Sequence, residues 1–258
     1  MIRKVINKLI LKRLFFFPIK EKIIAIVYYV YINPNKDWQK FILNQLGDIE
    51  KTKILNAADL YIEISNPSNV PGVESFFKKI DFTPKDIKLH KENKFEYWGI
   101  KRIWDIAQEN KNYKYMVYIH TKGITYKDSK RDLLEEVLTY YTFNKWKFFV
   151  KTLEKDSNIN KIGLFPACRK NTEGKIIRAG WVWYNFWWAK ADYIRTLKQP
   201  LINSDRYYYE SWLSNTTLNN ENYNDNFSIY EMTKASYTQQ EAVSNAKKLI
   251  KNYEYYFK

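Results

Sequence analysis

Four adjacent residues, His120, Thr121, Lys122 and Gly123, combine groups that can bind a phosphate or a sugar. Lys122 can neutralise a diphosphate, and His120 can donate a hydrogen bond to a phosphate or a sugar hydroxyl. Gly123 lets backbone amides come close to such a ligand. Taken singly, a strand-end histidine is more often structural, and a lysine before glycine usually lies in a solvated turn. The combination of all four favours a ligand site.

A second segment, Trp181–Ala189, surrounds Asn185 with large aromatic side chains. Aromatic faces pack against a pyranose or a nucleobase, and an amide fixes the direction of hydroxyl groups. A structural tryptophan cluster explains the same pattern equally well. Further along, Arg206 and Glu210 are four residues apart, so they share a helix face. On spacing alone, an ordinary surface ion pair is the favoured explanation.

Common nucleotide-binding motifs are missing from the chain. It has no Gly-x-Gly-x-x-Gly fingerprint and no phosphate loop ending in Gly-Lys-Ser/Thr, and its seven glycines leave little room for either. Dinucleotide cofactors and ATP hydrolysis are therefore disfavoured. No Asp-x-Asp pair is present, although such a pair is the usual holder of a divalent ion against a donor diphosphate. The sequence therefore leaves a role for Mn²⁺ or Mg²⁺ open.

Hydrophobic patterning predicts the elements that must position these residues. Residues 23–32 form a nearly continuous apolar run, which predicts a strand buried on both faces. Residues 38–49 carry apolar side chains at helical spacing, with Asp37 placed to cap the helix. Residues 115–120 form another strong strand, which delivers His120 at its carboxyl end.

Weaker patterns complete an alternation of strands and helices. The remaining predicted elements are strands at residues 60–64, 87–90 and 162–165, helices at residues 95–109, 133–149 and 238–256, and a loop at residues 215–226. This alternation predicts an α/β protein with a mostly parallel central sheet flanked by helices. Ligands of such sheets bind beyond the carboxyl ends of the strands, where the His120–Gly123 segment lies.

Composition suits a single domain over residues 21–258. The chain has 258 residues and 45% hydrophobic content, so it can bury a full core. Its net charge of +15 attracts phosphates, nucleic acid or an anionic membrane, but the charges are dispersed and no RNA-binding signature is present. Nucleic acid is therefore not an expected partner. The single cysteine, Cys168, excludes an intrachain disulfide.

Residues 1–20 predict a basic amphipathic helix at the amino terminus. Its apolar side chains share a face opposite Arg3, Lys4 and Lys8. We expect residues 1–18 to attach weakly to an anionic membrane surface, and a helix that caps the domain is the alternative. Charged residues interrupt every possible signal-peptide core, and no apolar stretch has transmembrane length. A cytoplasmic protein, peripheral on the inner face of a membrane, is therefore the prediction.

The order of these motifs resembles a small family of glycosyltransferases with the GT-A fold. The matching residues, in chain order, are His120-Thr121-Lys122-Gly123, Trp146 on a helix, Asn185-Phe186-Trp187-Trp188-Ala189, Tyr193-Ile194, Arg206, Glu210 and Trp212. Similar proteins occur in large DNA viruses, as in the amino-terminal domain of a chlorovirus enzyme, and in bacterial surface-polysaccharide gene sets. The resemblance runs from about Ile23 to Trp212. Similar proteins have Ser-Gly where this chain has Trp183 and Tyr184.

The resemblance implies a GT-A domain with a donor half at about residues 21–128 and an acceptor half at about residues 129–235. It implies transfer of a hexosyl or deoxyhexosyl group from a nucleotide-diphosphate sugar, with a UDP-sugar favoured, to a glycan acceptor in surface polysaccharide or glycoprotein glycan synthesis. The predicted donor-binding residues are Tyr31, Glu96, His120, Thr121, Lys122 and Gly123. The predicted acceptor-binding or sugar-binding residues are Asn185, Trp187, Trp188 and Arg206. Glu210 is the predicted catalytic carboxylate.

Two other functions stay open at this point. A catalytically silent GT-A domain would bind its donor without transfer, which the missing Asp-x-Asp and the Trp183-Tyr184 pair suggest. A basic nucleic-acid-binding protein is the less favoured alternative.

Overall fold

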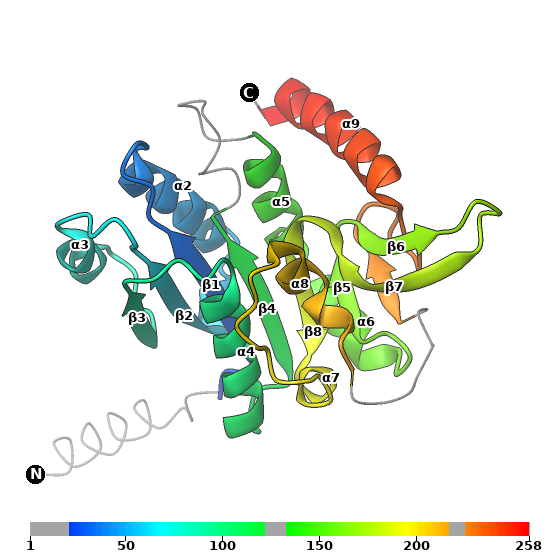
Figure 1. Cartoon of the computed structure of the whole chain (residues 1–258), viewed down its shortest axis with the longest axis horizontal. Helices are drawn as coiled ribbons and strands as arrows, with labels where there is room; N and C mark the ends of the chain where they lie inside the picture. The colour runs from blue at the N-terminus through cyan, green and yellow to red at the C-terminus, as the bar shows by residue number, and fades with distance from the viewer. Residues whose placement is uncertain (1–20, 122–132, 217–224, 258) are drawn as a thin grey trace, which may run out of the picture.

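The computed structural model describes residues 21–121, 133–216 and 225–257 (Figure 1). Within these ranges seven strands form one sheet, in the order β3-β2-β1-β4-β8-β5-β9. The predicted amino-terminal helix and the residues Lys122 and Gly123 lie outside the described residues.

The first half of the sheet is parallel, as predicted. Its strands are β3 (Asp86–His90), β2 (Ala58–Ser65), β1 (Ile24–Tyr31) and β4 (Tyr115–His120). Alternate side chains of β1 face opposite layers of the core: Ile26 and Tyr28 pack on one side, and Val27 and Tyr29 on the other. Because both faces are covered, a continuous apolar run is what this strand requires.

The second half of the sheet is mixed, and the sequence did not predict it. Strand β8 (Trp187–Lys190) runs antiparallel to both β4 and β5 (Lys161–Gly163), and β9 (Asn226–Ser228) pairs parallel with β5. A separate hairpin of β6 (Pro166–Lys170) and β7 (Ile176–Val182) extends from this half. Short 3₁₀ helices connect the elements: η1 (Ile54–Asn56), η2 (Trp183–Asn185) and η3 (Trp212–Ser214).

Helices cover both faces of the sheet, which confirms the predicted fold class. One face carries α2 (Trp38–Lys51), α3 (Val73–Lys79), α5 (Leu133–Phe143), α6 (Trp146–Lys155) and α9 (Gln239–Phe257). The other face carries α4 (Tyr97–Glu109), α7 (Ala191–Arg195) and α8 (Arg206–Ser211). Figure 1 shows α2, α5 and α9 along the top of the molecule and α4 and α7 at the bottom.

The predicted long helix at residues 133–149 is wrong, because the structure has two helices there. Lys145, with φ −110° and ψ 32°, separates α5 from α6. The Asn144 amide still makes the last helical bond of α5, to the Tyr140 carbonyl at 2.8 Å, and the Phe148 and Phe149 amides restart the ladder from the Lys145 carbonyl at 2.9 and 3.2 Å. Beyond the break, α6 places Phe149 against Trp188, with ring centroids 6.1 Å apart.

Other predicted elements differ from the structure only at their ends. Asp37 caps α2 through its side chain, which accepts from the Lys40 amide at 3.1 Å. The strand predicted at residues 162–165 covers residues 161–163, and residue 226, predicted as loop, begins β9. Among the described residues, no helix has both the length and the apolar character that crossing a membrane requires.

Candidate active site

The carboxyl ends of the four parallel strands meet at one edge of the sheet. In the strand register Tyr31 lies beside Ser65, Ser65 beside His90, and Tyr29 beside His120. Thr121 extends this edge, because its amide donates to the Tyr29 carbonyl at 3.0 Å and its hydroxyl accepts from the Tyr31 amide at 3.0 Å. Thr121 therefore joins β1 to β4, and the predicted donor residues Tyr31, His120 and Thr121 lie together.

Helix α4 brings Glu96 to this edge. Glu96 immediately precedes the helix, and Gly99 in the first turn lets α4 approach the sheet very closely. A Cβ atom at residue 99 would lie 2.6 Å from Tyr29 Cβ and 2.9 Å from Tyr118 Cε2. Since those distances exclude any side chain, the helix can hold this position only with glycine. Its amino-terminal end consequently reaches the side chains of β4.

Glu96 is the shared acceptor of a polar cluster, which we call the Glu96 cluster: Glu96, Tyr118, His120 and Asn185. The Oε2 atom of Glu96 accepts from the Tyr118 hydroxyl at 3.0 Å and from Asn185 Nδ2 at 2.6 Å. Its Oε1 atom lies 3.8 Å from His120 Nδ1. Burial, together with the negative charge of Glu96, holds the pKa of Tyr118 well above its usual value, so this phenol stays protonated and donates.

His120 is oriented from two sides. Its Nε2 lies 3.0 Å from the carbonyl oxygen of Tyr184, and its Nδ1 faces Glu96. Because a carbonyl oxygen can only accept, Nε2 carries the proton of this hydrogen bond. The histidine side chain is 9% exposed. The imidazole is therefore held at the surface of the cluster with one edge toward the carboxylate.

The 3₁₀ segment η2 supplies Asn185 and the Tyr184 carbonyl from a strained backbone. Tyr184 and Asn185 have φ values of 69° and 59°, in the left-handed region that favours glycine. Such a conformation costs about 1–3 kcal/mol for a residue with a side chain. Asn185 Oδ1 accepts from Trp187 Nε1 at 2.7 Å, which fixes the amide so that its nitrogen points at Glu96. The backbone at residue 184 therefore suits glycine better than tyrosine.

A second buried network supports the start of α4. Glu63 of β2 is 2.6 Å from His90 Nε2 and 3.3 Å from Arg102 Nε of α4. Trp98, in the first turn of α4, stacks flat on His90 with ring centroids 3.9 Å apart. Burial raises the pKa of Glu63, and the hydrogen bond from His90 lowers it in part. This network ties β2, β3 and α4 together beside Glu96.

The two predicted sugar-binding tryptophans are core residues in this structure. Trp187 and Trp188 have no exposed surface. Trp187 stacks on Tyr118 at a centroid distance of 5.4 Å, and Trp188 Nε1 donates to the Thr142 carbonyl at 2.9 Å on the opposite face of the sheet. Direct contact of either ring with a sugar does not fit this burial. Of the aromatic segment, Asn185 is the residue whose side chain bonds to Glu96.

Helix α8 lies beside the cluster. The Tyr209 carbonyl is 3.5 Å from Asn185 Nδ2, and the Tyr209 ring faces Phe95 at a centroid distance of 6.5 Å. On the same helix Arg206 and Glu210 form the predicted ion pair, 3.6 Å apart, with Arg206 59% exposed and Glu210 21% exposed. The structure therefore brings the helix of the predicted catalytic carboxylate alongside the predicted donor residues.

The Glu96 cluster does not fit a divalent ion by itself. It contains one carboxylate, whose oxygens face the hydrogen-bond donors Tyr118 and Asn185 and the imidazole of His120. Over the described ranges, no group of three or more His, Cys, Asp or Glu side chains is arranged to hold a metal ion.

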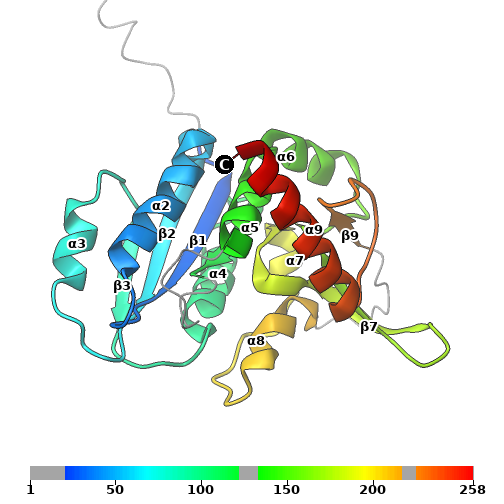
Figure 2. The ribbon, with the colours of Figure 1, turned by 90° about the horizontal axis from the view of Figure 1, so that it is seen from above.

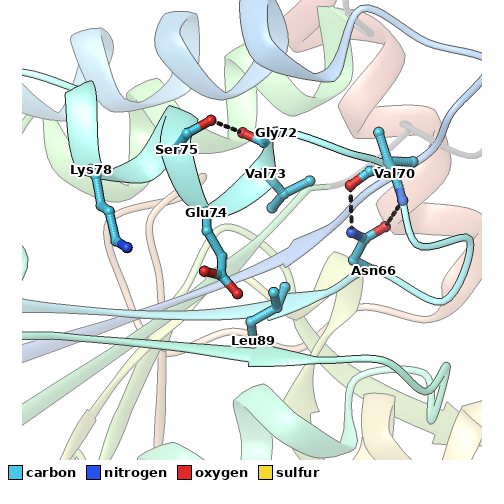
Figure 3. A pocket seen from close by; sticks show the side chains of 8 residues that line it. All are labelled: Asn66, Val70, Gly72, Val73, Glu74, Ser75, Lys78 and Leu89. Carbon is cyan, nitrogen blue, oxygen red and sulfur yellow. Dashed lines mark hydrogen bonds between the residues drawn. The ribbon is translucent and has the colours of Figure 1, made fainter.

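A surface cavity of about 400 Å³ lies at the same edge of the sheet, between α3 and the ends of β2 and β3 (Figure 3). Its lining residues are Asn66, Val70, Gly72, Val73, Glu74, Ser75, Lys78 and Leu89. The Asn66 amide is occupied by the backbone of Val70, with which it exchanges hydrogen bonds of 3.0 and 2.9 Å. None of the predicted site residues lines this cavity.

Sequence reasoning missed Tyr118 and Tyr209 as site residues. Tyr118 could have been found, because residues two apart on a strand point to the same side and His120 was already a candidate. No local signal identifies Tyr209, which reaches the site through its backbone carbonyl.

Together, the fold and the site define an α/β protein with a polar cluster at the carboxyl ends of parallel strands. A family model described as Domain of unknown function (DUF8361) matches residues 27–230, and the chain belongs to this family. No curated protein matches the sequence of this chain.

Two solved structures show remote similarity. One is 4-diphosphocytidyl-2C-methyl-D-erythritol synthase from Anaerococcus prevotii DSM 20548, with 9% identity and a TM-score of 0.40 over 88% of this chain and 98% of that one. The other, from Desulfovibrio desulfuricans G20, is described as a nucleotide-diphospho-sugar transferase, with 12% identity and a TM-score of 0.35 over 75% of this chain and 73% of that one. At these scores the similarity identifies no shared activity.

Proposed function

We propose that this protein is a glycosyltransferase that moves a sugar from a nucleotide-diphosphate sugar to a hydroxyl of a glycan acceptor. One observation carries the proposal. The two motifs of the family resemblance lie far apart in sequence but meet in space, since the His120 ring lies 5.3 Å from the Phe186 ring and His120 Nε2 contacts the carbonyl of Tyr184, the residue before Asn185. They meet beyond the carboxyl ends of parallel strands, where such sheets bind ligands.

The proposed reaction is a displacement at the anomeric carbon. The bond from this carbon to the donor diphosphate breaks, a bond to the acceptor oxygen forms, and the nucleoside diphosphate leaves. His120, and Lys122 in the segment outside the described residues, stabilise the growing negative charge of the leaving group. Glu210 takes the proton of the acceptor hydroxyl. Tyr31, Glu96, Thr121 and Gly123 complete the proposed donor site.

Arg206 is the proposed acceptor-side contact, and Asn185, which is 2% exposed and bonds to Glu96 and Trp187, is proposed to position the site. Arg206 is largely exposed and beside Glu210, so it can receive a polar acceptor from solvent. Asn185 holds its amide nitrogen on Glu96, so it links the acceptor side to the donor side. The proposal assigns Trp187 and Trp188 to the support of Asn185 and of the sheet.

A thermal-shift panel of UDP-, GDP-, dTDP- and CMP-sugars, each with and without manganese, tests the donor class. We expect one nucleotide group, with UDP favoured, to raise the melting temperature in a concentration-dependent way. A second assay then follows release of the nucleoside diphosphate in the presence of glycan acceptors. Failure of every nucleotide sugar to bind, with or without the metal, would contradict the proposal.

Two variants separate the proposed roles. Lys122→Ala removes one charge-assisted contact and should weaken donor binding by about 1.5–3 kcal/mol, which is roughly tenfold to a hundredfold. Glu210→Gln should bind the donor normally and lose turnover. Undiminished donor affinity in the first variant, or full turnover in the second, rejects the corresponding assignment.

A catalytically silent donor-binding domain is the second candidate. The observation that favours it is the Tyr184 side chain, which occupies a left-handed backbone position beside His120 where similar proteins have glycine. Donor binding in the thermal-shift panel, without either transfer or hydrolysis, would identify this function instead.

A further inference from the structure

Five exposed apolar side chains, which we call the front patch, lie on two projecting segments. Leu201 and Ile202, in the loop between α7 and α8, are 66% and 58% exposed. Ile176 and Ile177, at the start of β7, are 41% and 59% exposed, and Tyr207 of α8 is 59% exposed. Each of the two projections therefore exposes two adjacent aliphatic side chains to solvent.

The loop that carries Leu201 and Ile202 is held firmly. The Leu201 amide donates to the Tyr208 hydroxyl at 3.1 Å, and its carbonyl accepts from the Tyr209 hydroxyl at 3.3 Å. The Asn203 amide donates to the same Tyr209 hydroxyl at 2.8 Å. These backbone groups of the loop therefore form hydrogen bonds toward the protein, and the Leu201 and Ile202 side chains project into solvent.

The hairpin is joined to the same side of the molecule. Arg178 of β7 donates to the Ser211 hydroxyl of α8 at 3.1 Å, so the base of the hairpin rests on the helix that follows the loop. Figure 2 shows the α8 region and the β7 hairpin extending from the same side of the molecule. One flat surface placed against this side could contact both projections.

Positive charge accompanies the aliphatic residues. Between Arg169 and Arg178 the hairpin has four cationic residues and one acidic residue, Glu173. Lys198 and Arg206 are exposed on either side of the Leu201-Ile202 loop, but Asp205 and Glu210, which pairs with Arg206 at 3.6 Å, offset them, so the excess of positive charge lies on the hairpin. An excess of cations beside exposed aliphatic side chains complements a layer of anionic headgroups over hydrocarbon.

We infer that the front patch docks this protein on the surface of an anionic lipid bilayer. A lipid bilayer fits better than a folded protein partner. The exposed apolar residues lie on two separate projections, and a deformable bilayer can contact both at once. Nucleic acid would use the cations and the tyrosine, and it would leave four aliphatic side chains in water. The inference does not depend on transferase activity. If the proposed function is correct, the acceptor side of the Glu96 cluster lies beside the bilayer, because Tyr209 links it to the loop.

Vesicle flotation with the full chain tests the inference. Wild-type protein should float with phosphatidylcholine vesicles containing phosphatidylglycerol, and less with phosphatidylcholine alone or at high salt. Replacing Leu201, Ile202, Ile176 and Ile177 together by serine should lower the partition coefficient about tenfold or more. The matched control replaces Leu43 and Val243, which are 43% and 40% exposed elsewhere on the surface, by serine and should leave partition unchanged.

A site-specific probe separates the front patch from residues 1–20, which all these variants retain. Ile202→Cys can be labelled selectively with an environment-sensitive fluorophore, because the only other cysteine, Cys168, is buried. Anionic vesicles should shift the emission of this label to shorter wavelength and leave a label at Leu43→Cys unchanged.

Three results would overturn the inference. In the first, the serine variant floats as much as the wild type. In the second, the label at residue 202 does not respond to vesicles. In the third, the wild-type chain does not float but binds an oligonucleotide or an acidic protein through the patch. The last result assigns the patch to a macromolecular partner. None of these measurements uses a sugar donor, so their failure is distinct from failure of the proposed function.

Discussion

A single carboxylate organises the candidate site at the residue scale. The two oxygens of Glu96 face a phenol and the edge of an imidazole from strand β4 and an amide from the 3₁₀ segment η2. Because all three neighbours depend on one acceptor, the placement of His120 and Asn185 is coupled through Glu96. This coupling has a measurable consequence.

Glu96→Gln should lower turnover or donor affinity strongly. The amide brings an NH₂ group toward donors that previously met a carboxylate, so at least one hydrogen bond is lost or reversed. We expect a fall of about tenfold or more in kcat/KM, measured with the nucleotide sugar that the thermal-shift panel identifies.

The control for this variant is Glu92→Gln. Glu92 lies four residues earlier, and its side chain is 62% exposed. The Trp98 indole uses its backbone carbonyl, which the substitution keeps. Equal kinetics in the two variants would show that the cluster does not act in the reaction.

The residues of the site were only partly predictable from sequence. His120 and Asn185 were candidates from their positions near a strand end and within an aromatic segment, and the structure brings both to Glu96. Trp187 and Trp188 were assigned to sugar contacts because composition does not distinguish a buried aromatic ring from an exposed one. Burial depends on partners distant in sequence, such as Thr142 for Trp188.

At the scale of elements, the close approach of α4 to the sheet positions Glu96. Gly99→Ala forces a Cβ atom into Tyr29 and Tyr118, so the helix must move. We expect the free energy of unfolding to fall by about 1–3 kcal/mol, measured by urea denaturation, and donor binding to weaken because Glu96 moves with the helix.

Gly47→Ala is the matched control within another helix. Residue 47 lies inside α2, and a Cβ atom there meets nothing within 4 Å. Alanine should therefore stabilise the protein by about 0.5–1 kcal/mol, since glycine in a helix interior is unfavourable. If both alanine variants behave alike, the contact at Gly99 does not hold α4.

The elements that the sequence predicted well are those with one dominant pattern. Strands β1 and β4 are continuous apolar runs, and α2 and α9 have regular helical spacing. Strands β5, β8 and β9 have three or four residues each, too few for a periodicity to appear. The break between α5 and α6 depends on where each helix packs, so residues 133–149 alone do not reveal it.

At the scale of the whole molecule, a polar network links stability to pH. It lies near the amino-terminal end of β2, away from the candidate site at the carboxyl ends of the strands. Asp59 of β2 pairs with Lys85 at 2.7 Å and Lys22 at 3.5 Å, and it accepts a hydrogen bond from Tyr113. Burial alone would raise the pKa of Asp59, but the hydrogen bonds from Lys85 and Tyr113 outweigh it and lower the pKa.

Because the folded pKa of Asp59 is lower than the unfolded one, its contribution is present above the unfolded pKa and is lost as pH falls through the folded pKa. Asp59→Asn should therefore cost about 1 kcal/mol of unfolding free energy at pH 7. The difference from wild type should vanish as the solution becomes more acidic than the usual aspartate pKa. Urea denaturation at a series of pH values measures this, with the exposed Asp81→Asn as a control that should show no such trend.

The two edge strands of the seven-stranded sheet, β3 and β9, also affect whether two molecules can associate by strand pairing. Strand β3, at one edge, alternates Asp86, Lys88 and His90 along one face, and charges on an edge strand discourage pairing with a strand from another chain. In the part of the chain that the structure describes, the opposite edge is β9, only three residues long. A short edge and a charged edge both make poor templates for cross-molecule strand addition, so the seven-stranded sheet offers few sites at which aggregation could begin.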